Sequence, residues 1–141
     1  MDLDMSIEIT SKPNLEDDEF IIAKTREYNS QFIENRYEPL SIYFRDSKKE
    51  LIGGLTGKTF WDWLHVEYLW VSEKYRKSGV GSKILLAAEE EAKERSCIGS
   101  TLDTFSFQAL GFYKKLGYSI VGTLPEYRGG HKRYYLKKRL G

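Results

Sequence analysis

The sequence predicts a single α/β domain built on a mixed sheet, and three features of the chain point to that fold class. The length of 141 residues suits one domain, so we expect one domain over residues 1–141. Strand-like and helix-like stretches follow in the order strand, helix, three strands, helix, strand, helix, strand, strand. Residues 66–86 read as a strand, a Gly-containing turn and a helix. Together these features predict an antiparallel amino half joined to a central β-α-β unit.

The first half is predicted to hold one strand, one helix and a three-stranded antiparallel meander. Residues 6–10 alternate apolar and polar side chains, which is typical of a short strand. A helical apolar stripe runs over 15–34, with Asn14 placed to cap it. The meander is expected over 40–45, 50–60 and 64–71, with turns at 46–49 and 61–63. Gly53 and Gly54 indicate a bulge in its middle strand.

The second half is predicted to alternate helices and strands. A helix is expected over 79–95, where apolar residues recur at helical spacing and the run Glu89-Glu90-Glu91 falls on a solvated face. A strand over 98–104 and an aromatic-rich helix over 105–116 follow, with Gly117 as the C-cap. The last two strands are expected over 118–124 and 132–138, joined by a loop.

Composition excludes several classes of function. Charged residues make up 30% and hydrophobic residues 40%, as in ordinary soluble proteins, and the net charge is only +1. We therefore expect neither nucleic acid nor a membrane as a partner. The acidic start, with no apolar run after it, predicts no signal peptide. Cys97 is the only cysteine, which rules out an intrachain disulfide and a Cys-based metal site. A cytoplasmic protein without a metal is expected.

The turn between the central strand and helix has the features of an anion site. The first N–H groups of a helix lack intrahelical partners, and the helix dipole adds partial positive charge there. Gly79 and Gly81 lack a Cβ, so an anion can approach the backbone closely. Neither the Walker pattern nor the three-glycine dinucleotide pattern is present. A plain helix-entry turn is the alternative interpretation.

The pattern of Arg76, Gly79 and Gly81, placed after a strand and opening a helix, resembles the acyl-CoA pyrophosphate loop of the GNAT superfamily of N-acetyltransferases. The strand Leu69-Trp70-Val71 and the segments 102–109 and 130–134 look like those of its small bacterial stand-alone members. In that fold the fourth and fifth strands splay apart and the acyl-CoA arm lies in the gap.

A second segment carries the same resemblance. GNAT enzymes have an Asn-x-x-Ala-x-x-x-Tyr-x-x-x-Gly-Phe type segment at this place. Here Ala109, Tyr113, Gly117 and Tyr118 match its spacing, and Gln108 is close to the position often held by Asn. The resemblance implies acetyl-CoA as co-substrate. The residues it implies for binding acetyl-CoA are Leu69, Trp70, Val71, Arg76, Lys77, Ser78, Gly79, Val80, Gly81, Ser82, Gln108 and Tyr113.

The chemistry of amide formation assigns the catalytic residues. An amine attacks the thioester, so a base must remove a proton and an acid must protonate the departing thiolate. Glu67 is expected as the base, since burial in an apolar strand would raise the pKa of its carboxyl; a structural ion pair is the alternative. Tyr113 is expected as the acid, because a phenol with a pKa near 10 stays protonated at neutral pH; core packing is the alternative.

Two histidines and two tryptophans complete the candidates. His65 lies two residues before Glu67 and is a second candidate for the base, and His131 is expected in a loop that borders the acceptor. Trp61 and Trp63 are predicted to pack in the core, with a pocket or an interface as the alternatives.

The expected function is acetyl-CoA-dependent N-acetylation of a primary amine on a small molecule, by direct transfer. The alternatives are a non-catalytic acyl-CoA-binding module and an acetyltransferase for protein amines. A homodimer is an expectation from the family.

Overall fold

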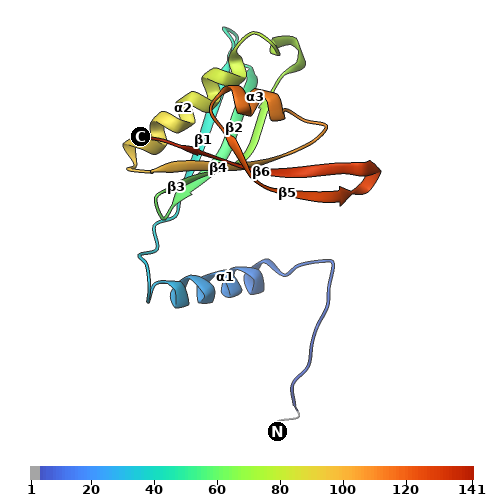
Figure 1. Ribbon diagram of the computed structural model, residues 1–141. Helices are drawn as coiled ribbons and strands as arrows, with labels where there is room; N and C mark the ends of the chain where they lie inside the picture. Colours follow the sequence, from blue (N-terminus) through green and yellow to red (C-terminus); the bar gives the residue numbers. More distant parts are fainter. Residues whose placement is uncertain (1–3) are drawn as a thin grey trace. The chain divides into compact units, whose positions relative to one another are not determined.

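The computed structural model describes residues 4–141 (Figure 1). Residues 1–3, which belong to the acidic start considered for a signal peptide, lie outside the described residues. The chain divides into two compact units, one ending at Asn35 and the other running from Arg36 to Gly141. Each unit is described separately.

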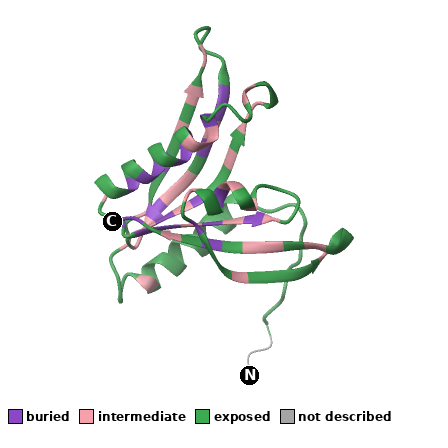
Figure 2. Ribbon diagram, turned by 45° about the horizontal axis from the view of Figure 1, so that its top comes forward, coloured by how far each residue is buried: buried purple, intermediate pink, exposed green. Residues whose placement is uncertain are grey.

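The first unit contains the helix α1, Leu15–Asn29, and no strand among its described residues. Asn14 caps α1 as predicted, since its Oδ1 accepts a hydrogen bond of 3.0 Å from Asp17 N. The helix ends earlier than predicted, because the Ser30 hydroxyl donates to Glu27 O and closes the last turn. Figure 2 shows no buried residue in α1.

The predicted strand over 6–10 is wrong. These residues have no regular secondary structure, and Ile7 and Ile9 are 90% and 92% exposed. A strand needs a hydrogen-bonded neighbour, and none of the described strands pairs with this segment. Alternation of apolar and polar residues therefore did not suffice.

The second unit contains a six-stranded sheet in the order β1-β2-β3-β4-β6-β5. Only β3 and β4 pair in parallel. The mixed sheet, its antiparallel amino half and its central β-α-β unit confirm the predicted fold class. The strands are β1 Glu38–Arg45, β2 Leu51–Phe60, β3 Trp63–Val71, β4 Gly99–Phe105, β5 Ser119–Tyr127 and β6 His131–Arg139; the helices are α2 Val80–Glu94 and α3 Leu110–Lys115, with short 3-10 turns at Glu73–Tyr75 and Arg128–Gly130.

Two details of the second unit differ from the prediction. The helix predicted over 105–116 is only α3, because Phe105 ends β4 and Gln108 holds the turn after it. Gln108 Oε1 accepts hydrogen bonds from Phe105 N at 2.8 Å and from the Thr104 hydroxyl at 3.2 Å. The bulge expected at Gly53 and Gly54 lies one residue earlier, where Ile52 is the extra residue opposite the step from Phe44 to Arg45.

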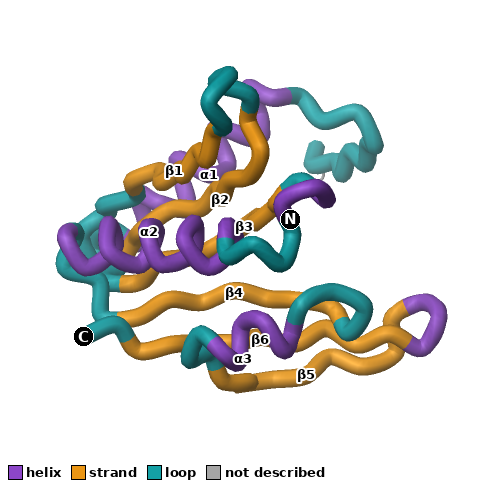
Figure 3. The backbone as a smooth tube through the Cα atoms, turned by 90° about the horizontal axis from the view of Figure 1, so that it is seen from above, coloured by secondary structure: helices purple, strands orange, loops and turns teal. Residues whose placement is uncertain are grey.

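The core lies between the sheet and the inward face of α2. Ile84, Leu85, Ala88 and Ala92 of this face are fully buried. They pack with sheet residues that include Leu55, Leu64, Leu102 and Leu136. In Figures 1 and 3, α2 and α3 lie on the same face of the sheet. A Cβ added at Gly53 would lie 2.9 Å from Ile84 Cδ1, so glycine there lets α2 approach the sheet closely.

A buried polar cluster joins α2 to β4, to β6 and to the residue before β5. The Glu89 side chain accepts a hydrogen bond of 2.6 Å from Lys138 Nζ and one of 2.8 Å from the Tyr118 hydroxyl. Tyr118 Oη also lies 2.8 Å from Ser100 Oγ. The expectation of a solvated run at residues 89–91 is therefore wrong for Glu89, which is 2% exposed, whereas its two neighbours are exposed.

Candidate functional site

The site is created where β3 and β4 separate. Their parallel ladder contains only the pairs Trp63 with Gly99, Leu64 with Ser100 and His65 with Thr101. Beyond His65 the two strands diverge (Figure 3). A β-bulge coincides with the separation, because Tyr68 pairs with Thr56 and Val66 pairs with Gly57 on β2, so that Glu67 is the extra residue. A cavity, here called the split-strand cavity, opens between the separated strands.

The split-strand cavity gathers most of the residues that the sequence singled out. Its lining comes from β3, the turn before α2, the first turn of α2, β4, the turn before α3, α3 itself and β6. The predicted residues in this lining are His65, Glu67, Leu69, Trp70, Val71, Arg76, Lys77, Gly79, Gly81, Ser82, Gln108 and Tyr113.

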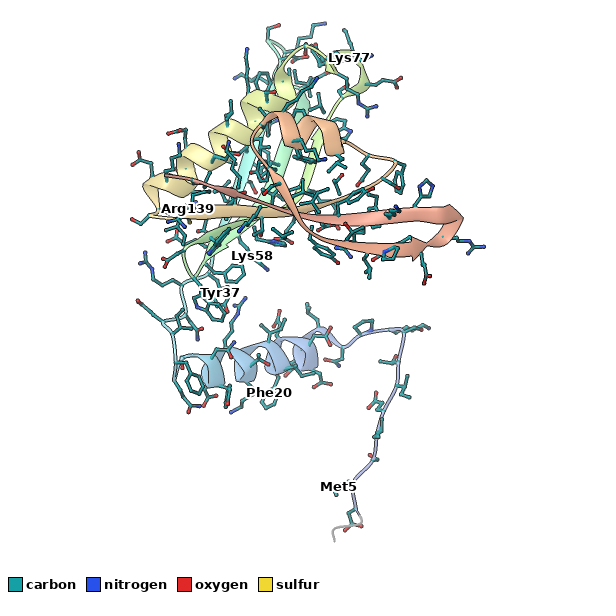
Figure 4. The ribbon with its side chains drawn as sticks, in the orientation of Figure 1. Met5, Phe20, Tyr37, Lys58, Lys77 and Arg139 are labelled. Carbon is teal, nitrogen blue, oxygen red and sulfur yellow. The ribbon has the colours of Figure 1, made fainter. Side chains whose placement is uncertain are left out.

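One end of the cavity is an anion cradle at the start of α2. Gly79 is the N-cap in the left-handed conformation, with φ of 87°, and nothing lies within 4 Å of the place a Cβ would occupy. The backbone N–H groups of the first turn of α2 lack intrahelical acceptors. Lys77, labelled in Figure 4, lies in the turn that leads into α2. Amides, the helix dipole and basic side chains together favour a phosphate group.

Several residues of this turn have structural roles. Arg76 Nε donates to Val71 O at 3.1 Å and holds the turn against the end of β3. A Cβ at Gly81 would lie 3.3 Å from Phe112, so this glycine lets the first turn of α2 approach α3. Two predicted residues of this turn do not line the cavity. The Ser78 hydroxyl donates to Tyr75 O, and Val80 belongs to the core.

The middle of β3 supplies the candidates for the base. Glu67 is exposed, so the desolvation expected from its apolar neighbours is absent. The bulge shifts the alternation, and Leu64 and Val66 are buried before it while Leu69 and Val71 are the more buried positions after it. His65 Nδ1 lies 3.2 Å from Thr101 Oγ1, a contact at the last paired position before the strands separate.

Tyr113 is the phenol that α3 presents to the cavity. The residue is 9% exposed, and its hydroxyl forms no hydrogen bond with any other residue of the described chain. Burial raises the pKa of Tyr113, and the negative charge of Asp103 raises it further. The phenol is therefore protonated at neutral pH and available as a hydrogen-bond donor.

His131 and the two tryptophans lie outside this lining. His131 Nδ1 is 3.2 Å from the Ser106 hydroxyl, and its ring packs edge-on against Phe107. This contact ties the β5–β6 turn to the turn after β4. Trp63 covers Gly99, where a Cβ would lie 2.4 Å from the indole ring, and Trp61 packs against the rings of Tyr37 and Phe60.

An ion pair of the cavity, formed by Asp103 and Arg133, was not predicted from the sequence. Arg133 Nε donates to Asp103 Oδ2 at 2.9 Å, across the β4–β6 pair. Alternation along β4 could have identified Asp103, because it places Asp103 on the same face of the strand as Thr101. Thr101 contacts His65, which was already a candidate.

Other site types find little support. No group of three or more His, Cys, Asp and Glu side chains within residues 4–141 is placed to hold a metal ion. Burial raises the pKa of the Cys97 thiol, which disfavours the reactive thiolate. None of the described helices is long and apolar enough to cross a membrane.

Comparison with known proteins agrees with this geometry. Residues 8–118 match the acetyltransferase (GNAT) family model. The chain is 42% identical to the blasticidin-S acetyltransferase of Streptomyces morookaense over 106 residues, which cover 72% of this chain and 78% of that protein. It is 37% identical to an acetyltransferase of Agrobacterium fabrum over 113 residues, covering 79% of this chain and 82% of that one.

A crystal structure of an Agrobacterium tumefaciens acetyltransferase has the same fold, with a TM-score of 0.90 and 32% identity over 96% of this chain and 99% of that chain. The resemblance inferred from the loop at Gly79 and the segment around Tyr113 is thereby confirmed. The protein is an acyltransferase, and the chain belongs to the acetyltransferase (GNAT) family.

Proposed function

We propose that this protein is an acetyl-CoA-dependent N-acetyltransferase that moves an acetyl group directly to a primary amine of a small molecule. The observation that supports it is the composition of the split-strand cavity. One cavity combines an anion cradle at Gly79, a neutral phenol at Tyr113 and a carboxylate at Glu67. These groups suit the three tasks of holding the carrier, protonating the thiolate and accepting the proton of the amine.

The carrier has two kinds of backbone partner in the cavity. The first turn of α2 offers free N–H groups to the pyrophosphate. On β3, the edge that faces β4 is unpaired beyond His65, while the opposite edge pairs with β2 as far as Val71. That free edge suits the amides of the pantetheine arm, which would add to the sheet as an extra strand does.

In the transfer step, the amine nitrogen adds to the thioester carbon to give a tetrahedral intermediate, and the carbon–sulfur bond of that intermediate then breaks to release the thiolate. Glu67 takes the proton released by the amine, directly or through a water molecule. Tyr113 gives a proton to the departing thiolate. His65 is the second candidate for the base, since its contact with Thr101 engages only Nδ1.

The relative that acetylates blasticidin S, at 42% identity, favours a small antibiotic-like amine as the acceptor. A non-catalytic acyl-CoA-binding module would have the anion cradle without the need for Glu67 and Tyr113. An acetyltransferase that acts on protein amines is the other alternative. We expect a homodimer only because the family resemblance implies one.

Replacing Gly79 by Asp is expected to weaken acetyl-CoA binding at least about a hundredfold, because the carboxylate repels the pyrophosphate. Calorimetric titration of acetyl-CoA measures the affinity. Gly79→Asn separates charge from backbone strain, because it strains the same left-handed position without charge. Gly122→Asp on β5, outside the cavity lining, is the matched control. Equal affinity for wild type and a folded Gly79→Asp variant would refute the cofactor assignment.

Replacing Glu67 by Gln is expected to lower kcat about 10²-fold or more with acetyl-CoA affinity unchanged, because Gln cannot accept the proton. The first assay is acetylation of blasticidin S, measured by the release of the free CoA thiol. Glu90→Gln on the exposed face of α2 is the control. An unchanged kcat would move the base to His65. If acetyl-CoA binds but a panel of small amines gives no transfer, the small-molecule acceptor assignment is wrong.

A further inference from the structure

Asp103 lies on β4, the strand across the gap from Glu67 on β3. The parallel ladder pairs Trp63 with Gly99, and each later pair keeps the same offset until it ends at His65 and Thr101. Glu67 and Asp103 each lie two positions after the last pair, at the start of the separated part of their strands. Both residues line the split-strand cavity. The cavity therefore has a carboxylate on each of its two strand walls.

Arg133 fixes the position of Asp103. Arg133 Nε donates to Asp103 Oδ2 at 2.9 Å, and its guanidinium group lies over the rings of Phe105 and Tyr135, at 5.6 and 4.9 Å from their centres. Its Nη1 donates to the Tyr127 hydroxyl at 3.4 Å. Arg133 is thus held by two rings, a hydroxyl and a carboxylate, and Asp103 is held in turn.

Asp103 retains capacity to accept hydrogen bonds. A carboxylate has about four acceptor positions, and the described residues supply only the bond to Oδ2. The side chain is 26% exposed, so a bound molecule in the cavity can reach it. The other cations of the lining are Arg76 and Lys77 before α2 and Lys115 at the end of α3.

A purely structural role leaves this arrangement unexplained. Part-exposed ion pairs contribute little to stability. The strands β4 and β6 already pair along the whole of β4, from Gly99 to Phe105. The ion pair is therefore not needed to hold the two strands together, whereas it does keep a carboxylate at a fixed place in the cavity.

We propose that Asp103 determines acceptor specificity by binding a second cationic group of the acceptor, an ammonium or a guanidinium, while the reacting amine lies at Glu67. Arg133 is a positioning residue that acts through Asp103. The inference rests on the proposed function and deepens it. It narrows the acceptor class to small molecules that carry a positive charge besides the reacting amine.

The test uses conjugates in which CoA is joined through its sulfur and an acetyl bridge to an alkylamide. Three tails of matched length end in an ammonium, a methyl or a carboxylate group, with a series of spacers of increasing length. The CoA part anchors every conjugate, so calorimetry reads the contribution of the tail alone. The proteins compared are wild type, Asp103→Asn, Arg133→Gln, and Asp18→Asn in α1 as the control.

Wild type is expected to bind the best ammonium conjugate about tenfold more tightly than its methyl counterpart. Asp103→Asn should lose this gain and keep its affinity for the methyl conjugate. Arg133→Gln should reduce the gain, and Asp18→Asn should leave it intact. A structural ion pair alone would change the melting temperature of Asp103→Asn without changing the preference between tails.

Three other results would overturn the inference. Equal affinity of wild type for the ammonium and methyl conjugates at every spacer length would show that no second cation is recognised. Tighter binding of the carboxylate conjugate would assign recognition to Arg133 instead. If no conjugate binds, both the cofactor assignment and the inference about Asp103 are wrong. If only the methyl conjugate binds, the inference about Asp103 is wrong and the proposed function is unaffected.

Discussion

Replacing Glu89 by Ala is expected to lower the free energy of unfolding by about 3 kcal/mol, toward the lower end of the range for breaking a buried ion pair. The substitution leaves Lys138 without its carboxylate partner and removes one of the two hydrogen-bond partners of the Tyr118 hydroxyl. The loss is not larger because the Lys138 side chain is 21% exposed and can regain water. Urea unfolding monitored by circular dichroism measures the change.

Two further variants separate the contributions to this loss. Glu89→Gln keeps an acceptor for Tyr118 and loses the charge, so its loss should be intermediate. Glu90→Ala removes a carboxylate of the same helix that pairs with Lys93 in solvent, and it should cost less than about 1 kcal/mol. Equal losses for Glu89→Ala and Glu90→Ala would mean that the buried cluster contributes nothing beyond a surface pair.

Burial also keeps the Tyr118 phenol of this cluster protonated. Burial raises the pKa of Tyr118, the hydrogen bond with Ser100 lowers it in part, and the negative charge of Glu89 raises it again. The phenol therefore remains the donor to Glu89 at every pH at which the protein is expected to work. The cluster thus joins α2 to Ser100 on β4, Tyr118 before β5 and Lys138 on β6.

Local patterns predicted what depends on neighbours in the sequence. The central strand, the turn at Gly79 and the helix after it are encoded by one contiguous stretch, and the structure agrees closely there. The strand expected over 6–10 failed because a strand depends on a partner that the sequence does not identify. Glu89 was predicted to be exposed because it is charged. Its position four residues after Leu85 puts it on the buried stripe of α2, and that position decides its burial.

The candidate site shows the same division. Glu67, Gly79 and Tyr113 were proposed from motif spacing, which needs no tertiary contact. The bulge at Glu67 escaped prediction, because a shift in alternation by one residue becomes visible only through the pairing with β2. Asp103 and Arg133 escaped for a related reason, since their ion pair joins residues that are 30 positions apart.

Replacing Tyr113 by Phe is expected to lower kcat about 10²-fold and to leave acetyl-CoA affinity nearly unchanged. The phenylalanine keeps the ring that packs against Phe112 and Tyr118, and no internal hydrogen bond of the described residues is lost. Only the proton for the thiolate is removed. Single-turnover measurement of thiol release, together with calorimetry, separates the two effects. Tyr43→Phe, exposed on β1 and outside the cavity lining, is the control.

The dependence of kcat on pH gives this assignment a second test. Because burial and Asp103 raise the pKa of Tyr113 above its usual value of about 10, the acid form persists through neutral and mildly alkaline pH. Loss of the proton should reduce kcat only at still higher pH, and Tyr113→Phe should lack this alkaline decline. Asp103→Asn should shift the decline to lower pH, since it removes a charge that favours the protonated phenol. A Tyr113→Phe enzyme with the kcat and pH profile of wild type would show that the thiolate departs without help from the phenol, and packing of the ring would then be the whole role of Tyr113.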